Sequence, residues 1–318
     1  MNTDIVMVGV DWGTTHRRAY GLDANGHCIA EHADAEGALA CKGRFPQALQ
    51  ALLEALNAQP QAVLMAGMVG SALGWQVAPY ADAGVALTAL PGHLYPVSDA
   101  PGPAKCSIVP GYCVRDAAGQ PDVMRGEETQ LLGAYCLGYH TGWFVLPGTH
   151  SKWVELHEGR VVRLRTYMTG ELYELLSTHG TLAAAVVAQS DWDSTAFSTG
   201  VLAAADGALS HQLFGCRARV VSGDMPAAQA RAYLSGLLIG AELQDIRRQM
   251  RNGPSHDGQG ASHLPLTVRL IGSPALAQIY QDAAALLEVQ LELIDARSAF
   301  IAAAHYLYQN SARPRVTP

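Results

Sequence analysis

Asp11-Trp12-Gly13-Thr14-Thr15 ends the mostly apolar run DIVMVGVD, residues 4–11, and together they predict a buried strand that stops in a glycine turn. Two further strand segments, 16–22 and 27–33, flank an Asn-Gly step that suits a tight hairpin. Leucines and alanines at helical spacing then predict a helix over 45–58, and a short apolar strand over 62–66 comes next. This alternation of strands and helices predicts an α/β domain.

The same order of elements recurs about one domain later. An apolar strand over 142–146 enters the turn Pro147-Gly148-Thr149-His150-Ser151, and a hairpin over 152–166 and a helix from 170 follow. One glycine hairpin alone is common in proteins that contain β-strands. Two copies in the same order, each with Gly-Thr at its first turn, indicate a structural duplication.

The remaining chain predicts mostly helices. We expect a helix over 227–250 and then a polar loop over 252–262. After the loop we expect a strand over 266–271 that ends in Gly272-Ser273, and later a helix over 296–308. We therefore expect a first domain over 1–137, a second over 138–295, and a C-terminal helix and frayed tail over 296–318 that returns to the first.

Composition excludes several classes of function. The net charge is −7 and no dense Lys/Arg stripe occurs, which argues against a nucleic-acid partner. No basic leader or long apolar run predicts export or a membrane span. The six cysteines are scattered and form no CxxC, which argues against a zinc site and a disulfide framework. A cytoplasmic protein with reduced thiols fits these features.

Both glycine turns carry the groups that a phosphate chain needs. Backbone N–H groups of a glycine turn form an anion-binding nest, hydroxyls add donors, and an acid such as Asp11 can hold hydrated Mg²⁺. The second turn adds His150 and Lys152. Neither a GxxxxGK[ST] loop nor a GxGxxG fingerprint after a strand is present. The alternative is that the turn residues only bond locally, and a single His beside Gly-Thr is more often such a residue.

Arg125-Gly126-Glu127-Glu128 places a cation and two carboxylates before the apolar helical run 131–135. One glutamate could accept the proton of an attacking hydroxyl while the other holds Mg²⁺ through water, and Arg125 could bind an anionic group of the substrate. The alternative is that the acidic residues only complement the helix dipole.

A second candidate for the substrate pocket is the segment that follows the strand over 62–66. Its candidate residues are Gly67, Met68, Gly70, Ser71 and Trp75. Glycines permit close approach of a polyol, a serine supplies a hydrogen bond and a tryptophan a flat wall. The alternative is an ordinary glycine-rich connection with Trp75 in the core.

These segments resemble the superfold of sugar kinases, actin and chaperones. Asp11-Trp12-Gly13-Thr14-Thr15 is similar to its first phosphate motif, Leu146-Pro147-Gly148-Thr149 to its second, and Ile271-Gly272-Ser273 to its adenosine motif. More narrowly, DWGTTHRRAY, GMVGSALGW, MRGEETQLLG, LPGTHSKWV and MTGELYELLS resemble the 2-dehydro-3-deoxygalactonokinase family.

The resemblance implies two actin-like (ribonuclease H-like) lobes, a duplicated mixed sheet flanked by helices, and ATP with Mg²⁺ in a cleft between the lobes. It implies transfer of the γ-phosphate to the 6-hydroxyl of 2-dehydro-3-deoxy-D-galactonate in galactonate catabolism, with the sugar acid on the first lobe. The residues expected to bind the nucleotide are Gly13, Thr14, Thr15, Gly148, Thr149, His150, Ser151, Lys152, Gly236, Gly240, Gly272 and Ser273. Asp11 and Glu128 are expected to organise Mg²⁺ and Glu127 to act as base, with the two glutamates interchangeable.

The sequence departs from the superfold at two positions. Leu146 stands where the second phosphate motif usually begins with Asp, and Gly272-Ser273 replaces paired glycines. Two rivals follow: a polyphosphate or guanosine-pentaphosphate phosphatase of the same superfold, in which a glutamate activates water, and a non-catalytic sugar-acid sensor. No DNA-binding extension supports the sensor. A gluconate-series substrate and a homodimer remain open.

Overall fold

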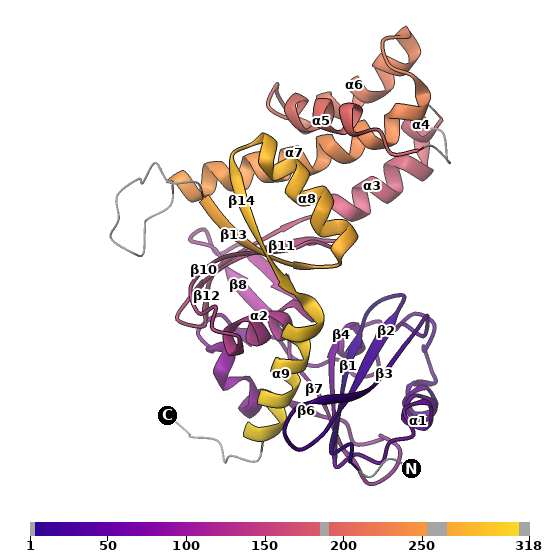
Figure 1. Ribbon diagram of the computed structural model, residues 1–318, viewed down its shortest axis with the longest axis vertical. Coiled ribbons are helices and arrows are strands. Elements are labelled where there is room, and N and C mark those ends of the chain that lie inside the picture. Colours follow the sequence, from indigo (N-terminus) through magenta and orange to yellow (C-terminus); the bar gives the residue numbers. More distant parts are fainter. Residues whose placement is uncertain (1–3, 185–190, 253–265, 312–318) are drawn as a thin grey trace. The chain divides into compact units, whose positions relative to one another are not determined.

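The computed structural model describes residues 4–184, 191–252 and 266–311. The loop expected after Asn252 and the tail from 312 lie outside these residues. The described chain forms two compact units: the first holds 4–142, Val154–Leu164 and 294–311, and the second holds the rest (Figure 1).

The first unit contains a larger and a smaller sheet with helices on the larger one. Its elements are β1 (Met7–Trp12), β2 (Arg17–Leu22), β3 (Cys28–Asp34), α1 (Phe45–Ala55), β4 (Ala62–Gly67), η1 (Met68–Gly70), β5 (Ala81–Asp82), η2 (Leu87–His93), β6 (Tyr95–Pro96), β7 (Lys105–Ile108), β8 (Tyr112–Arg115), β9 (Pro121–Met124), α2 (Glu127–Cys136) and α9 (Ala296–Asn310).

The larger sheet has the strand order β3-β2-β1-β4-β7-β6. β1 pairs with β2 antiparallel and with β4 parallel, and β3 pairs with β2. The expected meander of three strands therefore lies on one side of β1 and the strand expected over 62–66 on the other. Five of the six residues of β1 are buried, as its apolar sequence predicts for a central strand covered on both faces. Asp11 is the exception, and it lies near the carboxyl end of the strand.

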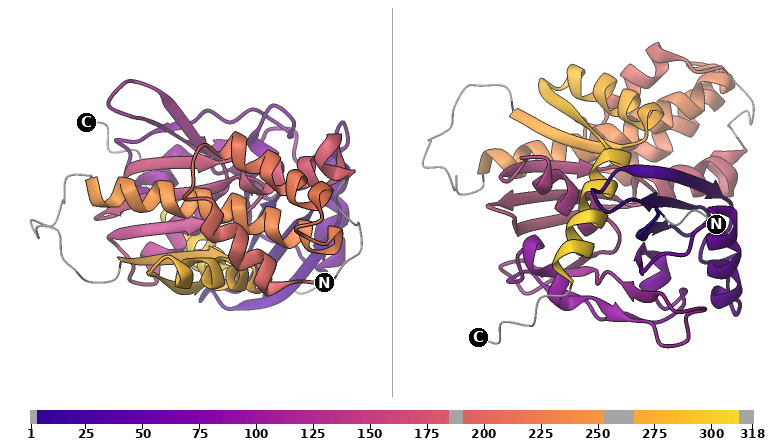
Figure 2. Two further views of the ribbon diagram at one scale, coloured as in Figure 1. Left: turned by 90° about the horizontal axis from the view of Figure 1, so that it is seen from above. Right: turned by 60° about the horizontal axis from the view of Figure 1, so that its bottom comes forward.

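The C-terminal helix α9 completes the first unit, and it lies beside α2 and the strands around β1 (Figures 1 and 2). Two glycines allow this close packing. A Cβ on Gly133 of α2 would come within 1.8 Å of the carbonyl oxygen of Ala299, and one on Gly9 of β1 within 3.0 Å of the Ala304 Cβ. Small residues thus let the helix backbone approach the sheet and its neighbouring helix.

The second unit repeats the strand–turn–hairpin order and adds a group of helices. Its elements are β10 (Gly142–Leu146), β11 (Ser151–His157), β12 (Arg160–Tyr167), α3 (Thr169–Thr178), α4 (Gly180–Ala183), α5 (Ser194–Ala203), α6 (Leu209–Ser222), η3 (Ala227–Gln229), α7 (Ala230–Asn252), β13 (Leu266–Gly272), α8 (Pro274–Leu286) and β14 (Val289–Asp295). The tip of the β11–β12 hairpin is counted with the first unit.

Its sheet has the order β12-β11-β10-β13-β14, with β10 parallel to β13. The predicted duplication is therefore confirmed: β1–β2–β3 and β10–β11–β12 share one order of elements, and each first strand has a parallel neighbour. A separate apolar core lies under each sheet. Within the described residues, no helix has the length and apolar character of a membrane span.

Candidate active site

Asp11 lies beside the first glycine turn, one residue before the end of β1. Its side chain is 31% exposed, and its Oδ2 lies 3.8 Å from Nη1 of Arg18 on the neighbouring strand. Desolvation by the surrounding protein raises the pKa of Asp11, and the charge of Arg18 lowers it by a smaller amount. By its exposed area the Asp11 side chain is partly accessible, and Arg18 is the cation that the described chain places beside it.

The first glycine turn is held from behind by the loop that follows β3. Inside the turn, the Gly13 amide donates to the His16 carbonyl at 2.9 Å, while Thr14 and Thr15 are exposed. Gly37 of the loop lies so close that a Cβ there would meet the Thr15 carbonyl carbon at 2.4 Å. Thr14 and Thr15 are thus exposed on a turn whose other side packs closely against the loop at Gly37.

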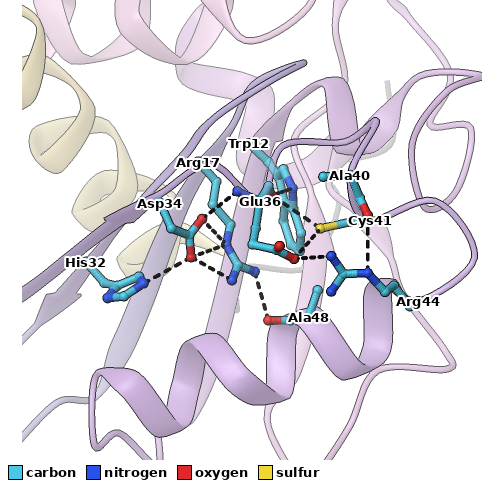
Figure 3. A network of polar contacts seen from close by, with 9 residues as sticks. All are labelled: Trp12, Arg17, His32, Asp34, Glu36, Ala40, Cys41, Arg44 and Ala48. Carbon is cyan, nitrogen blue, oxygen red and sulfur yellow. Dashed lines mark hydrogen bonds and ion pairs between the residues drawn. The ribbon is translucent and has the colours of Figure 1, made fainter.

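A polar network fixes this loop to the strand (Figure 3). The buried Arg17 forms a bidentate pair with Asp34, with Nε–Oδ1 and Nη2–Oδ2 distances of 3.0 and 2.9 Å, and lies over the Trp12 ring. The Trp12 indole donates to the Glu36 carbonyl at 2.9 Å, and the Glu36 carboxylate pairs with Arg44. Bidentate pairs of this kind have defined geometry, so the network orients the loop behind the turn.

Two glycines with positive φ bring a third segment to the end of β1. Gly67, at the end of β4, has φ +91°, and a Cβ there would lie 2.8 Å from the Trp12 carbonyl oxygen. Gly126 has φ +110°, and its Cβ would lie 3.1 Å from the Gly67 Cα. The amino end of α2 therefore reaches the ends of β1 and β4 only because side chains are absent at both positions.

The adjacent Glu127 and Glu128 have different surroundings. Glu127 is partly exposed, and its Oε2 accepts the Arg125 amide hydrogen at 2.9 Å. Glu128 is fully buried and accepts the Gly126 amide hydrogen at 2.7 Å and the Thr129 hydroxyl at 3.1 Å. Burial, together with the charge of Glu127, raises the pKa of Glu128 to about 8.

The expectation that Glu128 holds Mg²⁺ is therefore not supported. A carboxyl that is buried, occupied by two donors and mostly protonated at neutral pH is a poor ligand for a hydrated cation. Which of the two glutamates accepts the proton stays a prediction, and Glu127 is the more exposed of the pair.

Arg125 carries buried donors without partners. Its Nη2 donates to the Ala78 carbonyl at 2.8 Å, and its guanidinium lies over the Tyr80 ring at 4.3 Å. Its Nε and Nη1 are buried and find no hydrogen-bond partner among the described residues, and Nη1 would lie 2.9 Å from a Cβ on Gly70. Unpaired buried donors on a cation are costly, which points to an anion as their partner.

The other residues of the predicted substrate pocket are mainly structural. The Ser71 hydroxyl donates to the Met68 carbonyl at 2.8 Å and accepts from an amide in the same turn. Trp75 stacks on Phe45 at a ring distance of 6.0 Å and donates its indole N–H to Asp99 at 3.0 Å. Ser71 and Trp75 therefore follow the alternative reading, in which this segment is a packed connection.

The second glycine turn is exposed at Gly148, Thr149 and His150. The start of α3 packs against it: a Cβ on Gly170 would lie 2.3 Å from the Gly148 carbonyl oxygen, and the Glu171 amide donates to the Thr149 carbonyl at 2.9 Å. The His150 ring and the Glu171 carboxylate lie 2.5 Å apart. His150 therefore has a carboxylate partner within its own unit.

The surroundings of Ser151 and Lys152 do not favour the expected role of these residues as nucleotide contacts. Ser151 is fully buried and donates to the Glu242 carboxylate at 2.6 Å. Lys152 is buried too, and its ammonium donates to the Thr166 hydroxyl on β12 at 2.9 Å. Because successive strand residues face opposite sides of a sheet, these two side chains lie on opposite faces of the sheet and bond to partners there.

Glu242 of α7 was not singled out by the sequence. It is 2% exposed, burial raises its pKa, and it accepts hydrogen bonds from Ser151, Trp153, Thr169 and Tyr280. The only sequence signal is an acid on a helical face between Leu238 and Ile246, where an apolar residue is expected.

Gly236 and Gly240 of α7 also differ from expectation. Both are buried, and a Cβ would lie 2.0 Å from the Phe197 carbonyl oxygen at Gly236 and 2.5 Å from that of Val201 at Gly240. We therefore assign them to the close crossing of α5 and α7 rather than to nucleotide contact. Glycines spaced by four residues lie on one helix face, which explains why both meet the same neighbour.

Gly272 and Ser273 lie at the junction of β13 and α8. Ser273 is exposed and caps the helix, because its hydroxyl accepts the Leu276 amide hydrogen. A Cβ on Gly272 would be in ordinary contact with Pro147, at 3.5 Å, so the strand ends of β10 and β13 are neighbours. A helix start beside the second glycine turn suits a phosphate or ribose.

The donor set for a divalent cation is small. Within the described ranges no three His, Cys, Asp or Glu side chains are grouped to hold a metal. Mg²⁺ in phosphoryl-transfer sites is held by one or two carboxylates plus phosphates and water. The accessible Asp11 fits that mode of binding.

Comparisons with known proteins agree over nearly the whole chain. The family model of 2-keto-3-deoxy-galactonokinase matches residues 11–306. The 2-dehydro-3-deoxygalactonokinase of Escherichia coli (strain K12) is 38% identical over 242 residues, which cover 76% of this chain and 80% of the relative. A relative from Rhizobium meliloti (strain 1021), "Probable 2-dehydro-3-deoxygalactonokinase DgoK1", is 35% identical and covers 94% of this chain and 95% of its own.

Solved structures give the same result. The structure described as "Crystal structure of a putative 2-dehydro-3-deoxygalactonokinase protein from Sinorhizobium meliloti" has a TM-score of 0.84 at 33% identity, and the match covers 98% of both chains. The activator of 2-hydroxyisocaproyl-CoA dehydratase from Clostridium difficile has a TM-score of 0.50 at 11% identity, covers 96% of this chain and 95% of its own, and shares the fold alone. Neither the phosphatase nor the sensor reading finds support among these relatives.

Proposed function

Because this chain belongs to the 2-keto-3-deoxy-galactonokinase family, we propose that it transfers the γ-phosphate of ATP to the 6-hydroxyl of 2-dehydro-3-deoxy-D-galactonate. The observation that carries the proposal is the family match over residues 11–306, which runs from the end of β1 through both glycine turns and their hairpins. The reaction takes place in the cytoplasm and yields a 6-phosphate that a catabolic lyase or aldolase could cleave.

The acid group of the substrate binds to the first unit at Arg125. Two guanidinium donors, Nε and Nη1, are buried without a partner in the described chain, while the third nitrogen and the ring of Tyr80 hold the side chain in place. Buried donors without partners on a guanidinium favour an anionic ligand, because charge-assisted hydrogen bonds to a carboxylate are strong.

Glu127 is the base that receives the proton of the 6-hydroxyl. It is partly exposed, lies at the start of α2, and is next to the arginine that binds the acid group. Phosphoryl transfer depends mainly on positioning and charge neutralisation, so one carboxylate in reach of the hydroxyl is sufficient.

The glycine turns bind the phosphate chain of ATP, the first through Gly13, Thr14 and Thr15 and the second through Gly148 and Thr149. The nucleoside part of ATP binds at the junction of β13 and α8, beside Ser273. Asp11 would hold Mg²⁺ through water, and the ion would neutralise phosphate charge.

The test is ADP production from ATP and Mg²⁺ with 2-dehydro-3-deoxy-D-galactonate, its gluconate isomer and a control without sugar, followed by mass spectrometry of the product. ADP that depends on the galactonate isomer, with a monophosphorylated acid, is the expected result. Phosphate release without sugar would replace the kinase by a hydrolase, and no turnover with either acid would remove the substrate assignment. Faster turnover of the gluconate isomer would reassign the substrate.

A further inference from the structure

We propose that Glu242 is a positioning residue that fixes the nucleotide-binding segments of the second unit relative to one another. This inference rests on the proposed binding of ATP to that unit. Its carboxylate is the common acceptor of four side chains, with donor distances of 2.6 Å from Ser151, 2.5 Å from Trp153 and 3.0 Å from Tyr280. Thr169 is the fourth donor.

Each donor belongs to a segment that ends at the site. Ser151 directly follows the second glycine turn, and Thr169 directly precedes Gly170, which packs on the carbonyl of Gly148. Tyr280 lies on α8, less than two turns after the cap residue Ser273. One buried side chain therefore links the glycine turn, the start of α3 and the helix that begins at the adenosine motif.

The acceptor capacity of the group matches its donors. A carboxylate offers about four lone-pair sites, and four donors use them. A smaller acceptor would leave buried hydroxyls or the indole N–H unpaired, which is unfavourable for donors that water cannot reach. The geometry therefore admits few alternatives, and the three segments that supply the donors take one arrangement around Glu242.

An apolar side chain would be the simpler choice for helix-to-sheet packing. Burying a carboxylate costs several kcal/mol before its partners compensate, and such groups often add more to specificity than to stability. Leu238, Leu243 and Ile246 of the same helix supply the apolar contacts already. The carboxylate at 242 instead fixes the relative positions of its partners, and a misplacement of about 1 Å in a binding segment is enough to impair function.

The test measures ATP binding by calorimetry without sugar acid, and the KM values for ATP and sugar acid. Glu242→Gln keeps the size of the side chain but exchanges one acceptor oxygen for a donor, and we expect its Kd and KM for ATP to rise at least tenfold while KM for the sugar acid changes less than twofold. Ser151→Ala and Thr169→Val each remove one donor and give smaller rises in the same direction. These milder variants decide the question if Glu242→Gln does not fold.

Ile246→Ala is the matched control, because it weakens the same helix in the same core without touching the carboxylate. It should lose stability yet keep the wild-type Kd for ATP. An equal rise in Kd for Ile246→Ala, or unchanged ATP binding in Ser151→Ala, Thr169→Val and Glu242→Gln, would overturn the inference. If the wild type itself binds no ATP, the proposed function fails instead.

Discussion

Gly126 packs directly on Gly67: a Cβ on the first would lie 3.1 Å from the Cα of the second, and both have positive φ, +110° and +91°. Through this contact, the start of α2 and the end of β4 meet next to the Trp12 carbonyl at the end of β1. Glu127, Arg125 and the first glycine turn are therefore brought together by backbone contacts that only glycine allows.

We expect Gly126→Ala to lower the free energy of unfolding by roughly 2–3 kcal/mol and to reduce kcat, because the new Cβ combines a strained φ with a tight contact beside Glu127. Gly119→Ala is the matched control, since Gly119 has φ +79° but meets no atom of the described residues within 4 Å. It should cost about 1 kcal/mol, as backbone strain alone does. Equal losses in urea unfolding would show that the contact with Gly67 has no energetic role.

Glu127→Gln should reduce kcat by roughly 10²- to 10⁴-fold, the usual loss on removing a general base. Glu128→Gln should stay within a few-fold of the wild type, since the amide replaces a carboxyl that is already mostly protonated at neutral pH. Steady-state kinetics at pH 7 on both variants checks this. A larger loss for Glu128→Gln would exchange the two roles.

The protonation of Glu128 also predicts a pH dependence of stability. In the folded protein its pKa is raised from 4.5 to about 8, so between these values the folded state keeps a proton that the unfolded state has lost. This stabilisation is complete below about pH 4.5 and disappears as the pH rises towards about 8.

Glu128→Gln removes that titration. We therefore expect the difference in free energy of unfolding, wild type minus Glu128→Gln, to fall by roughly 1 kcal/mol per pH unit between pH 5.5 and 7.5. Urea unfolding of both proteins across this range is the measurement. Glu242 titrates in both and cancels, so a constant difference would mean that Glu128 has an ordinary pKa.

Arg125→Met should raise KM for the sugar acid by roughly 10- to 100-fold, because charge-assisted hydrogen bonding to the carboxylate is lost, while KM for ATP stays unchanged. The uncharged amide of the sugar acid should be bound equally poorly by wild type and variant. Arg115→Met, which removes an exposed arginine that bonds only to a carbonyl in its own turn among the described residues, is the control. Discrimination between acid and amide that survives in Arg125→Met would place the acid group elsewhere.

Gly236→Ala should lower the free energy of unfolding by roughly 1–3 kcal/mol through overpacking against α5, although alanine is the better helix former. Gly215→Ala, on a helix position whose Cβ would meet only a flexible glutamine at 3.9 Å, should instead stabilise by about 0.5–1 kcal/mol. Opposite signs in urea unfolding would support the packing role. A raised KM for ATP in Gly236→Ala without loss of stability would return this glycine to the nucleotide site.

Local sequence determined the elements and their order. The apolar run before Asp11, the Asn25-Gly26 turn and the second copy around Gly148 predicted strands, hairpins and a duplication that the structure contains. Period-2 and helical patterns, together with glycine turns, act over a few residues, so they can be read without knowing the fold. The five quoted motifs likewise identified the family before any comparison of structures.

Only the tertiary structure decided what individual side chains do. Glu127 and Glu128 are the same residue type and are adjacent in the sequence. Glu127 is nevertheless partly exposed and Glu128 buried, because the helix start at Gly126 packs against Gly67. Ser151, Gly236 and Glu242 took their roles from partners about 40 to 130 residues away in the chain. Burial and hydrogen-bond partners are set by packing between distant segments, and this is why charge, pKa and access at the site could not be derived from the sequence alone.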